Sequence, residues 1–471
     1  MLIKSLYISF VILFCASLEV SAQYGSVGSF DSRSMGMAKT YTATSRGINA
    51  IGINPANLMY EEDGHFEFST VLPLPTTSLR SGTDFLSIDD FNYYFGGVNG
   101  ESRYLNDQDK EKLDNLFKNG GDVFMNASTR IFSASWKIND KIGAIGISMT
   151  DFAGSYLKIP HSLIEIPLYG NTIEQVYSFN DANVKSWWLR DYSLSYAREI
   201  PCPKFLDKLF AGISLKYVNG FYYVGTENVN TSVETNSQYQ ISGTANLVGH
   251  AAFSENFGVN YDFDSTNNYE SHFSPFPSPA GKGIGMDFGL SASLSPVLNV
   301  SFAITDIGSI KWDQRAVQYS ALGDIYIDDI SNKDQIDSVG DKLKGKGEYI
   351  NNFSTPLPTA IRFGISYFMK ESLIPGTLLV GMDYNQGLND FPGNTTKARL
   401  SFGSEWKPMD WIPYIRTGLS FGGWAGFNWA VGLGIDAGIV DLNLATSDMN
   451  SLVAPNSAKH LSVSFGSRWK F

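Results

Sequence analysis

Apolar and polar residues alternate along most of this chain, and residues 458–471 show the pattern most clearly. Apolar side chains recur there at alternate positions, namely Leu461, Val463, Phe465, Trp469 and Phe471. Because successive side chains of a strand point to opposite faces, this pattern predicts a β-strand with one apolar and one polar face. Segments 282–295, 396–407 and 426–436 repeat the pattern.

Fourteen segments share this alternation. They are predicted as strands at 64–73, 127–138, 142–157, 187–199, 208–225, 282–295, 298–312, 358–370, 377–387, 396–407, 412–423, 426–436, 439–448 and 458–471. Most are longer than the usual five or six residues and approach the length that crosses a bilayer at a tilt. A soluble sandwich would also alternate, but the polar face here is rich in Gly and Ser, which suits the interior of a membrane barrel.

The connections between the predicted strands are alternately long and short. Loops 74–126, 158–186, 226–281 and 313–357 all follow odd-numbered strands, whereas connections after even-numbered strands have at most eight residues. Short periplasmic turns and long external loops are typical of outer-membrane barrels. We therefore predict that residues 64–471 form an all-β, 14-stranded antiparallel transmembrane β-barrel in the cell outer membrane.

The tryptophans and the charges fit the same prediction. All nine Trp residues fall at or near predicted strand ends, where an amphipathic ring favours the membrane–water boundary. The formal net charge is −12, and the four long loops together carry −14. Loop acidity indicates either solvated loops or divalent-cation bridges to outer-membrane lipid and lipopolysaccharide, and both interpretations stay open.

Composition excludes several other classes of protein. With 14% aromatic residues the chain is not of the disordered class. After residue 22 no run of about 18 apolar residues occurs, which excludes a helical membrane protein. The acidic balance argues against a nucleic-acid partner.

The first 63 residues precede the predicted barrel. Residues 1–22 have one lysine, an apolar run and small residues before Gln23, and they are predicted to be a secretory signal peptide. Residues 23–63 are too apolar for a free tail. Because the lumen of a fourteen-stranded barrel is too wide for side chains alone to fill, we predict that residues 23–63 form an N-terminal plug.

Two short motifs in this plug carry a resemblance. With Arg33-Ser34-Met35-Gly36-Met37 and the motif Asn54, Pro55 and Ala56, the chain resembles the FadL-type family of outer-membrane transporters for long-chain fatty acids and aromatic hydrocarbons. It departs from the family at Lys39, Thr40 and Asn57. The resemblance implies a channel for passive uptake of small hydrophobic molecules, with the plug as its gate.

The resemblance also leaves other functions open. Barrels of this type serve as accessory subunits of the type IX secretion system. The alternative is therefore a non-transporting accessory or scaffold barrel with secretion-system or surface proteins as partners. A general porin-like polar pore is a third interpretation.

A carboxylate interrupts the apolar phase of the third predicted strand. Ile145, Ile147 and Met149 set the lipid-facing phase, and Asp151 falls in it, with Gly154 soon after. Because charge facing lipid is costly, either a bulge or kink turns Asp151 inward or Asp151 lies above the bilayer. The resemblance implies that a kink in this strand opens a side gap through which apolar ligand leaves.

Other charges fall in the lumen-facing phase of predicted strands. They are Asp287, Arg362, Asp383, Arg399, Glu405, Arg416, Asp441 and Arg468. Their mixed signs indicate plug anchoring or a balanced lumen rather than ion selectivity. At the C-terminus, Phe465, Trp469 and Phe471 resemble the assembly signal that barrel-insertion machinery reads.

The sequence offers little catalytic chemistry. The five histidines show no metal-ligand spacing, and the mature chain holds one cysteine, Cys202. We therefore predict no enzyme activity, no metal and no cofactor. A short helix is predicted within 107–120, with Asp107 as its cap; its apolar stripe of Leu113, Leu116 and Phe117 either captures ligand or packs on its own loop.

Overall fold

The computed structural model describes residues 31–60, 64–98, 101–259, 274–329, 331–370, 374–391, 393–423 and 426–471. The predicted signal peptide lies outside these residues. No helix in the described ranges is long and apolar enough to cross a membrane.

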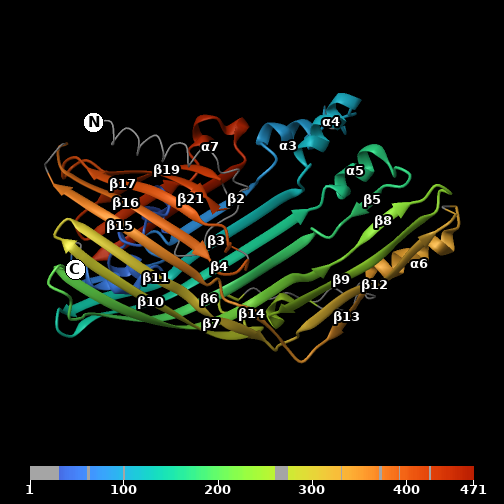
Figure 1. Cartoon of the computed structure of the whole chain (residues 1–471). Coiled ribbons are helices and arrows are strands. Elements are labelled where there is room, and N and C mark those ends of the chain that lie inside the picture. Colours follow the sequence, from blue (N-terminus) through green and yellow to red (C-terminus); the bar gives the residue numbers. More distant parts are fainter. Residues whose placement is uncertain are drawn as a thin grey trace.

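The strands form a closed antiparallel barrel of fourteen wall strands, as the alternation predicted (Figure 1). In chain order the wall strands are β1 (Phe66–Thr70) with β2 (Thr76–Thr83), β3 (Gly121–Asn139), β4 (Gly143–Ile159), β6 (Asn183–Glu199), β7 (Lys208–Val229), β10 (Gly281–Ser295), β11 (Leu298–Trp312), β14 (Phe353–Pro356) with β15 (Ala360–Lys370), β16 (Thr377–Gly387), β17 (Arg399–Lys407), β18 (Tyr414–Gly422), β19 (Phe427–Asp436), β20 (Val440–Thr446) and β21 (His460–Lys470).

The last strand closes the barrel against the first. The backbone N–H of Phe66 donates to Phe471 (3.0 Å), and that of Phe471 donates to Phe66 (2.8 Å). Farther along the same seam, β21 pairs with β2 from His460 to Phe465. Closure leaves the wall without an unpaired edge, which a sheet in lipid requires.

The first wall strand is longer than predicted and is interrupted. β1 and β2 both pair with β3 and with β21, so they act as one strand, and residues 71–75 between them leave the ladder. This five-residue segment contains Pro73 and Pro75, which have no backbone N–H to donate to a ladder. The prediction of a strand over 64–73 therefore missed the part that continues to Thr83.

Three of the long loops contribute to a lobe beyond the barrel, although no strands were predicted there. β7 continues past the wall to Val229 and pairs with β9, which pairs with β12. The lobe also contains short strands and a helix; its elements are β5 (Val176–Ser178), β8 (Ser232–Thr235), β9 (Ile241–Phe253), β12 (Val317–Ile327), β13 (Lys346–Tyr349) and α6 (Lys333–Lys344). Figure 1 shows this lobe at the end of the molecule opposite the C-terminus.

Besides α6, the helices of the described chain lie in the loops and in the segment before β1. Those in the loops are α3 (Ile88–Phe95), α4 (Asp107–Leu116), α5 (Ser162–Tyr169), α7 (Asn450–Val453) and the 3-10 turns η3 (Glu255–Phe257) and η5 (Pro455–Ser457). The cap of α4 is Asn106 rather than Asp107. Leu113 and Phe117 of this region pack into a cluster with Phe85 and Leu86, so this stripe packs largely on its own loops.

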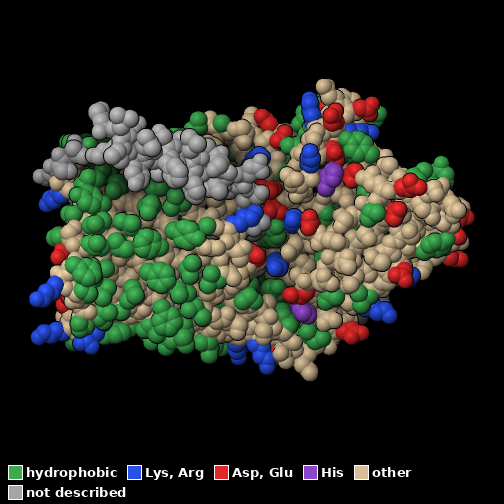
Figure 2. Space-filling model, in the orientation of Figure 1, with side chains coloured by type: hydrophobic (Ala, Val, Ile, Leu, Met, Phe, Trp, Pro, Cys, Tyr) green, Lys and Arg blue, Asp and Glu red, His purple; other side chains and the backbone are tan. Residues whose placement is uncertain are grey.

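An apolar band surrounds the outside of the barrel. Exposed side chains such as Ile147, Leu194, Ile284 and Phe402 belong to it, and Figure 2 shows hydrophobic side chains gathered densely on the barrel half and only scattered on the lobe half. A band of this kind around a closed barrel is the surface that faces lipid. The fold is therefore that of a transmembrane β-barrel.

The tryptophans divide into two groups, which corrects the prediction that all lie at the membrane boundary. Trp136 and Trp429 are exposed on the outer face. Trp187 and Trp312 are instead 1% and 0% exposed, within a cluster of apolar residues on the inner side. Trp424 lies outside the described residues.

Candidate functional site

Residues 31–60, which we call the lumenal segment, lie inside the barrel. The segment contains α2 (Ser32–Gly36) and the 3-10 turns η1 (Gly47–Ala50) and η2 (Pro55–Met59), whose residues are all buried. η2 contacts β6, β7 and β10, while α2 contacts β19 and β20 on another side of the wall. Figure 1 shows the segment in blue within the ring of strands.

Glycines in the wall let the lumenal segment approach closely. A Cβ on Gly418 would lie 2.5 Å from the carbonyl carbon of Met37, and one on Gly403 would lie 2.6 Å from the Met37 carbonyl oxygen. A Cβ on Gly212 would collide with Pro55 and Ala56. These lumen-facing glycines therefore make room for backbone rather than for water.

The motif Asn54, Pro55 and Ala56 lies at the point where η2 meets β10. The Asn54 side chain accepts from the backbone N–H of Ala56 (3.1 Å), and its Nδ2 donates to Ser291 Oγ (3.0 Å). Ser291 also donates to Asn57. Asn54 therefore caps the turn and at the same time ties it to the wall.

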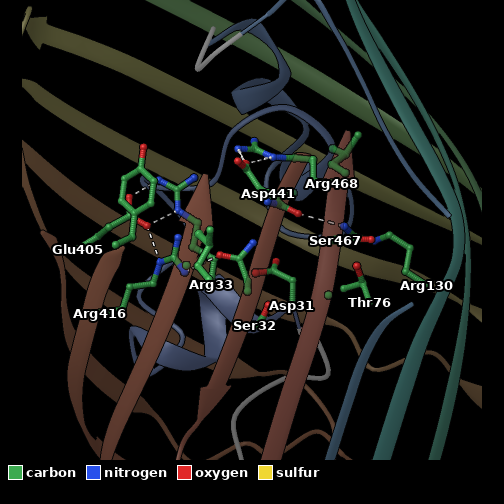
Figure 3. Close-up of a pocket in the computed structure, with 17 residues that line it drawn as sticks. Asp31, Ser32, Arg33, Thr76, Arg130, Glu405, Arg416, Asp441, Ser467 and Arg468 are labelled. Atoms are coloured by element: carbon green, nitrogen blue, oxygen red, sulfur yellow. Dashed lines mark hydrogen bonds and ion pairs between the residues drawn. The ribbon is translucent and has the colours of Figure 1, made fainter. Parts of the chain in front are cut away.

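An ion-pair network holds the other end of the segment (Figure 3). Arg33 Nε donates to Glu405 Oε2 (2.9 Å) and Arg33 Nη2 donates to Glu405 Oε1 (2.7 Å). Arg416 Nε donates to the same carboxylate (2.6 Å) and its Nη1 donates to Asn443 (2.7 Å). This is a bidentate Arg–carboxylate contact between α2 and the wall, the strongest geometry for such a pair.

All eight charges predicted to face the lumen are buried in the structure. Asp383 Oδ2 accepts the backbone N–H groups of Tyr41 (2.8 Å) and Thr42 (2.6 Å), so it also holds the lumenal segment. Arg468 pairs with Asp441 within the wall. Of the remaining three, Arg362 donates to Thr305 (3.5 Å) and Arg399 is buried. The third is Asp287.

Asp287 belongs to a second cluster, centred on Lys216, which the sequence analysis did not identify. Lys216 Nζ lies 2.8 Å from Asp287 and 2.6 Å from Asp306, and 3.7 Å from Asp191. Asp306 has a φ of 59° at a register shift between β10 and β11, a conformation that Asp tolerates better than most residues. This bulge turns the Asp306 carboxylate toward Lys216.

A cavity of about 50 Å³ lies beside this cluster. One side is apolar and belongs to a larger cluster of buried residues that contains Trp187, Leu189, Val218 and Leu357. The other side presents Asp191, which the sequence places in the lumen-facing phase of its strand. In the described chain, the apolar cluster fills the part of the lumen toward the lobe, where Trp187 packs 5.1 Å from Phe391 between ring centroids.

The third wall strand bears on one of the two alternatives for Asp151. β4 pairs without a register shift across 151–154 with both β3 and β6, and the irregularity lies in β3 at Ile131. Asp151 stays in the outward phase and forms a bidentate pair with Arg190 (2.5 and 2.8 Å). Because the register is unbroken there, neither a kink at the buried Gly154 nor an inward turn of Asp151 is seen, and a release route at this strand stays a prediction.

The predicted assembly residues lie at the seam. Trp469 and Phe471 stack on Phe68, each at 5.9 Å between ring centroids. Phe465 lies opposite Thr77 of β2. Their recognition by insertion machinery stays a prediction.

Signals for the Lys216 cluster were present in the sequence. Lys216 alternates with Leu215 and Tyr217, which places it in the lumen-facing phase by the same rule that identified the other eight charges. Asp306 could not be assigned by this rule, because the bulge changes its phase.

Comparisons with known proteins identify one matching family model and several solved barrel structures that are similar to this chain. A family model described as "Family of unknown function (DUF5723)" matches residues 62–446. No curated protein matches. Solved structures similar to this chain include the toluene transporter TbuX of Ralstonia pickettii, with 13% identity, a TM-score of 0.47, and coverage of 94% of this chain and 99% of that one.

Two other similar structures cover nearly the whole chain. The toluene transporter TodX of Pseudomonas putida has 10% identity, a TM-score of 0.44, and coverage of 95% and 99%. A FadL homologue of Pseudomonas aeruginosa has 11% identity, a TM-score of 0.43, and coverage of 95% and 100%.

Proposed function

The chain belongs to the DUF5723 family, whose description assigns no function, and we propose from its own geometry that it is an outer-membrane channel for small apolar molecules. The observation that carries this proposal is the apolar part of the lumen formed by Trp187, Leu189, Val218 and Leu357. Porin lumens are polar because they hold water. An apolar inner wall instead favours solutes that leave water readily.

The lumenal segment supplies the gate of this channel. Polar contacts hold it against the glycine-lined wall, among them Arg33–Glu405, Asp383 with the backbone of Tyr41 and Thr42, and Asn54–Ser291. Passage requires that this segment or the apolar cluster around Trp187 move, because two cavities between segment and wall measure only about 30 and 50 Å³.

Uptake of an apolar tracer tests the proposal. Val218→Trp fills the cavity from the inner face and should lower uptake of a compound such as toluene or naphthalene. Tyr217→Phe, on the outward face one residue away, is the matched control and should leave uptake unchanged. If cells with the wild-type barrel take up the tracer no faster than cells without it, the channel proposal fails.

The folded lobe favours a second candidate function. β9 and β12 pair over eleven residues and α6 packs on them through Val339, so this is a built surface rather than a loose loop. A scaffold that binds other surface or secretion proteins through the lobe needs no passage through the lumen. Co-purification of a partner with a barrel that transports no tracer would support the scaffold.

A further inference from the structure

The cavity beside the Lys216 cluster has an apolar side and a charged end. Phe152, Trp187 and Leu189 line the first, while Asp191, Lys216 and Asp306 line the second. A cavity of this size holds a few water molecules or one small polar group. This arrangement suits the polar head of a molecule whose apolar body lies along the aromatic wall.

Carboxylates outnumber cations at the charged end. Lys216 is the single amine among Asp191, Asp287 and Asp306. Its ammonium lies within hydrogen-bond distance of Asp287 and Asp306 but not of Asp191. Asp287 is completely buried, and its Oδ2 accepts no hydrogen bond from the described residues. The cluster therefore carries formal negative charge that Lys216 does not balance.

Two arginines, Arg130 and Arg362, lie near the cluster. Arg130 lines the cavity and donates to Asn49 (3.0 Å), and the carboxylates of Asp31 and Glu67 act on its charge. Arg362 does not line the cavity, and it interacts with Asp306 and Asp287 of the cluster as well as with Asp383. Carboxylates of the protein therefore already act on the charges of both arginines.

Asp191 and Asp306 both line the cavity, and of the two only Asp191 makes no hydrogen bond with Lys216. The Asp191 side chain keeps 14% exposure inside the barrel, close to the 16% of Asp306 and above the 0% of Asp287. Asp191 Oδ2 lies 3.7 Å from Lys216 Nζ, too far for a hydrogen bond, and Asp191 Oδ1 is buried with no partner among the described residues. An acceptor of this kind is costly to leave unmet, and a donor group on a ligand would satisfy it.

We propose that this cavity binds small amphipathic molecules with a protonated amine head, accepts alcohols less well, and rejects carboxylic acids. An ammonium group donates to Asp191 and offsets the excess negative charge. A carboxylate there would be buried beside three others, which raises its free energy. The inference rests on the proposed function, because it names the class of molecule that the channel would bind.

The test uses four probes with the same apolar body. Binding of 2-phenylethylamine, 2-phenylethanol, phenylacetate and ethylbenzene to the purified full barrel is measured by calorimetry at pH 7. We expect the amine to bind at least about tenfold more tightly than phenylacetate, with the alcohol between them, since paired charges in a buried site differ by this order. Asp191→Asn should reduce the ratio of amine to acid affinity to within about threefold.

Controls separate the site from general charge effects. Asp89→Asn changes an exposed carboxylate in α3, outside the barrel, and should leave the affinity ratio at its wild-type value. The folded fraction of each variant is checked by heat-modifiable migration. Equal affinity for the amine and phenylacetate in the wild type, or a ratio unchanged by Asp191→Asn, would overturn the inference.

The same experiment distinguishes this inference from the channel proposal. If tracer uptake depends on Val218 but the four probes bind equally, the head-group preference is wrong and the channel stands. If none of the probes binds, the cavity is not a ligand site, and tracer uptake then decides the channel proposal separately.

Discussion

Asp151 and Arg190 place charge on the outer face of the wall, where lipid would make an unpaired charge costly. Arg190 is almost completely buried: it contacts Asp151 through two hydrogen bonds, donates to the Pro275 carbonyl (3.0 Å) and lies 4.9 Å from the Phe276 ring centroid. The strand stays regular because the neighbouring strand supplies the counter-charge. A sequence pattern on one strand could not reveal this partner.

This pair gives the first prediction. Arg190→Gln should lower the free energy of unfolding by about 2–4 kcal/mol, because it leaves Asp151 without its partner. Adding Asp151→Asn should recover most of the loss. Denaturant titration in detergent measures both, as a double-mutant cycle. Equal stability of the Arg190→Gln variant and the wild type would show that Asp151 is instead solvated.

Gly418 gives a second prediction at the same scale. Gly418→Val places carbon where the Met37 backbone lies, at a cost of about 1–3 kcal/mol if the segment resists. The segment should yield before the wall does, since the wall is held by continuous pairing on both sides. Bilayer conductance should therefore rise or fluctuate more, with heat-modifiable migration unchanged. Gly340→Ala, where a Cβ meets open space in α6, is the control.

At the scale of elements, alternation predicted the wall well because each wall strand has lipid on one side and the lumen on the other. Strands β9 and β12 were not predicted, because they lie outside the lipid band. Their residues Ala245 and Ile325 pack on α6 instead of facing lipid. The break at 71–75 was not predicted, because Val71, Leu72 and Leu74 continue the apolar composition of the strand. Buried Trp187 and Trp312 resembled boundary residues, because position along a strand does not tell inside from outside.

The alternation of side chains along each strand predicted which charged residues face the lumen, but not what they contact. Phase identified Glu405 and Asp383, which hold the lumenal segment, but not which backbone groups they meet. Nor could phase show that Lys216 is shared by carboxylates from three strands, because such contacts depend on register.

The seam between β21 and β1 gives the third prediction. Phe471 supplies both a backbone pair with Phe66 and a ring stacked on Phe68. Deleting Phe471 should lower the folded membrane fraction several-fold, because barrel closure loses its terminal pair. Phe471→Trp keeps both the backbone pair and the aromatic ring and should fold normally. Heat-modifiable barrel at wild-type levels in the deletion would show that closure does not depend on this residue.

At the scale of the whole molecule, the two ends of the barrel differ in kind. One end has short turns and the C-terminus, while the other has the lobe and helices α3, α4 and α5 (Figure 1). A long, folded loop is harder to pass through a membrane than a short turn during insertion. We therefore expect the lobe outside the cell and the short turns, including 200–207, in the periplasm.

Cysteine labelling tests this orientation. Cys202 lies in the 200–207 turn and is partly accessible, so a membrane-impermeant maleimide should label it only after the outer membrane is opened. In a Cys202→Ser background, Ser237→Cys in the turn between β8 and β9 should be labelled on intact cells. Labelling of Cys202 after lysis shows that its thiol is reactive, which makes its protection in intact cells informative. The reverse pattern would place the lobe in the periplasm and remove it from any external ligand or surface partner.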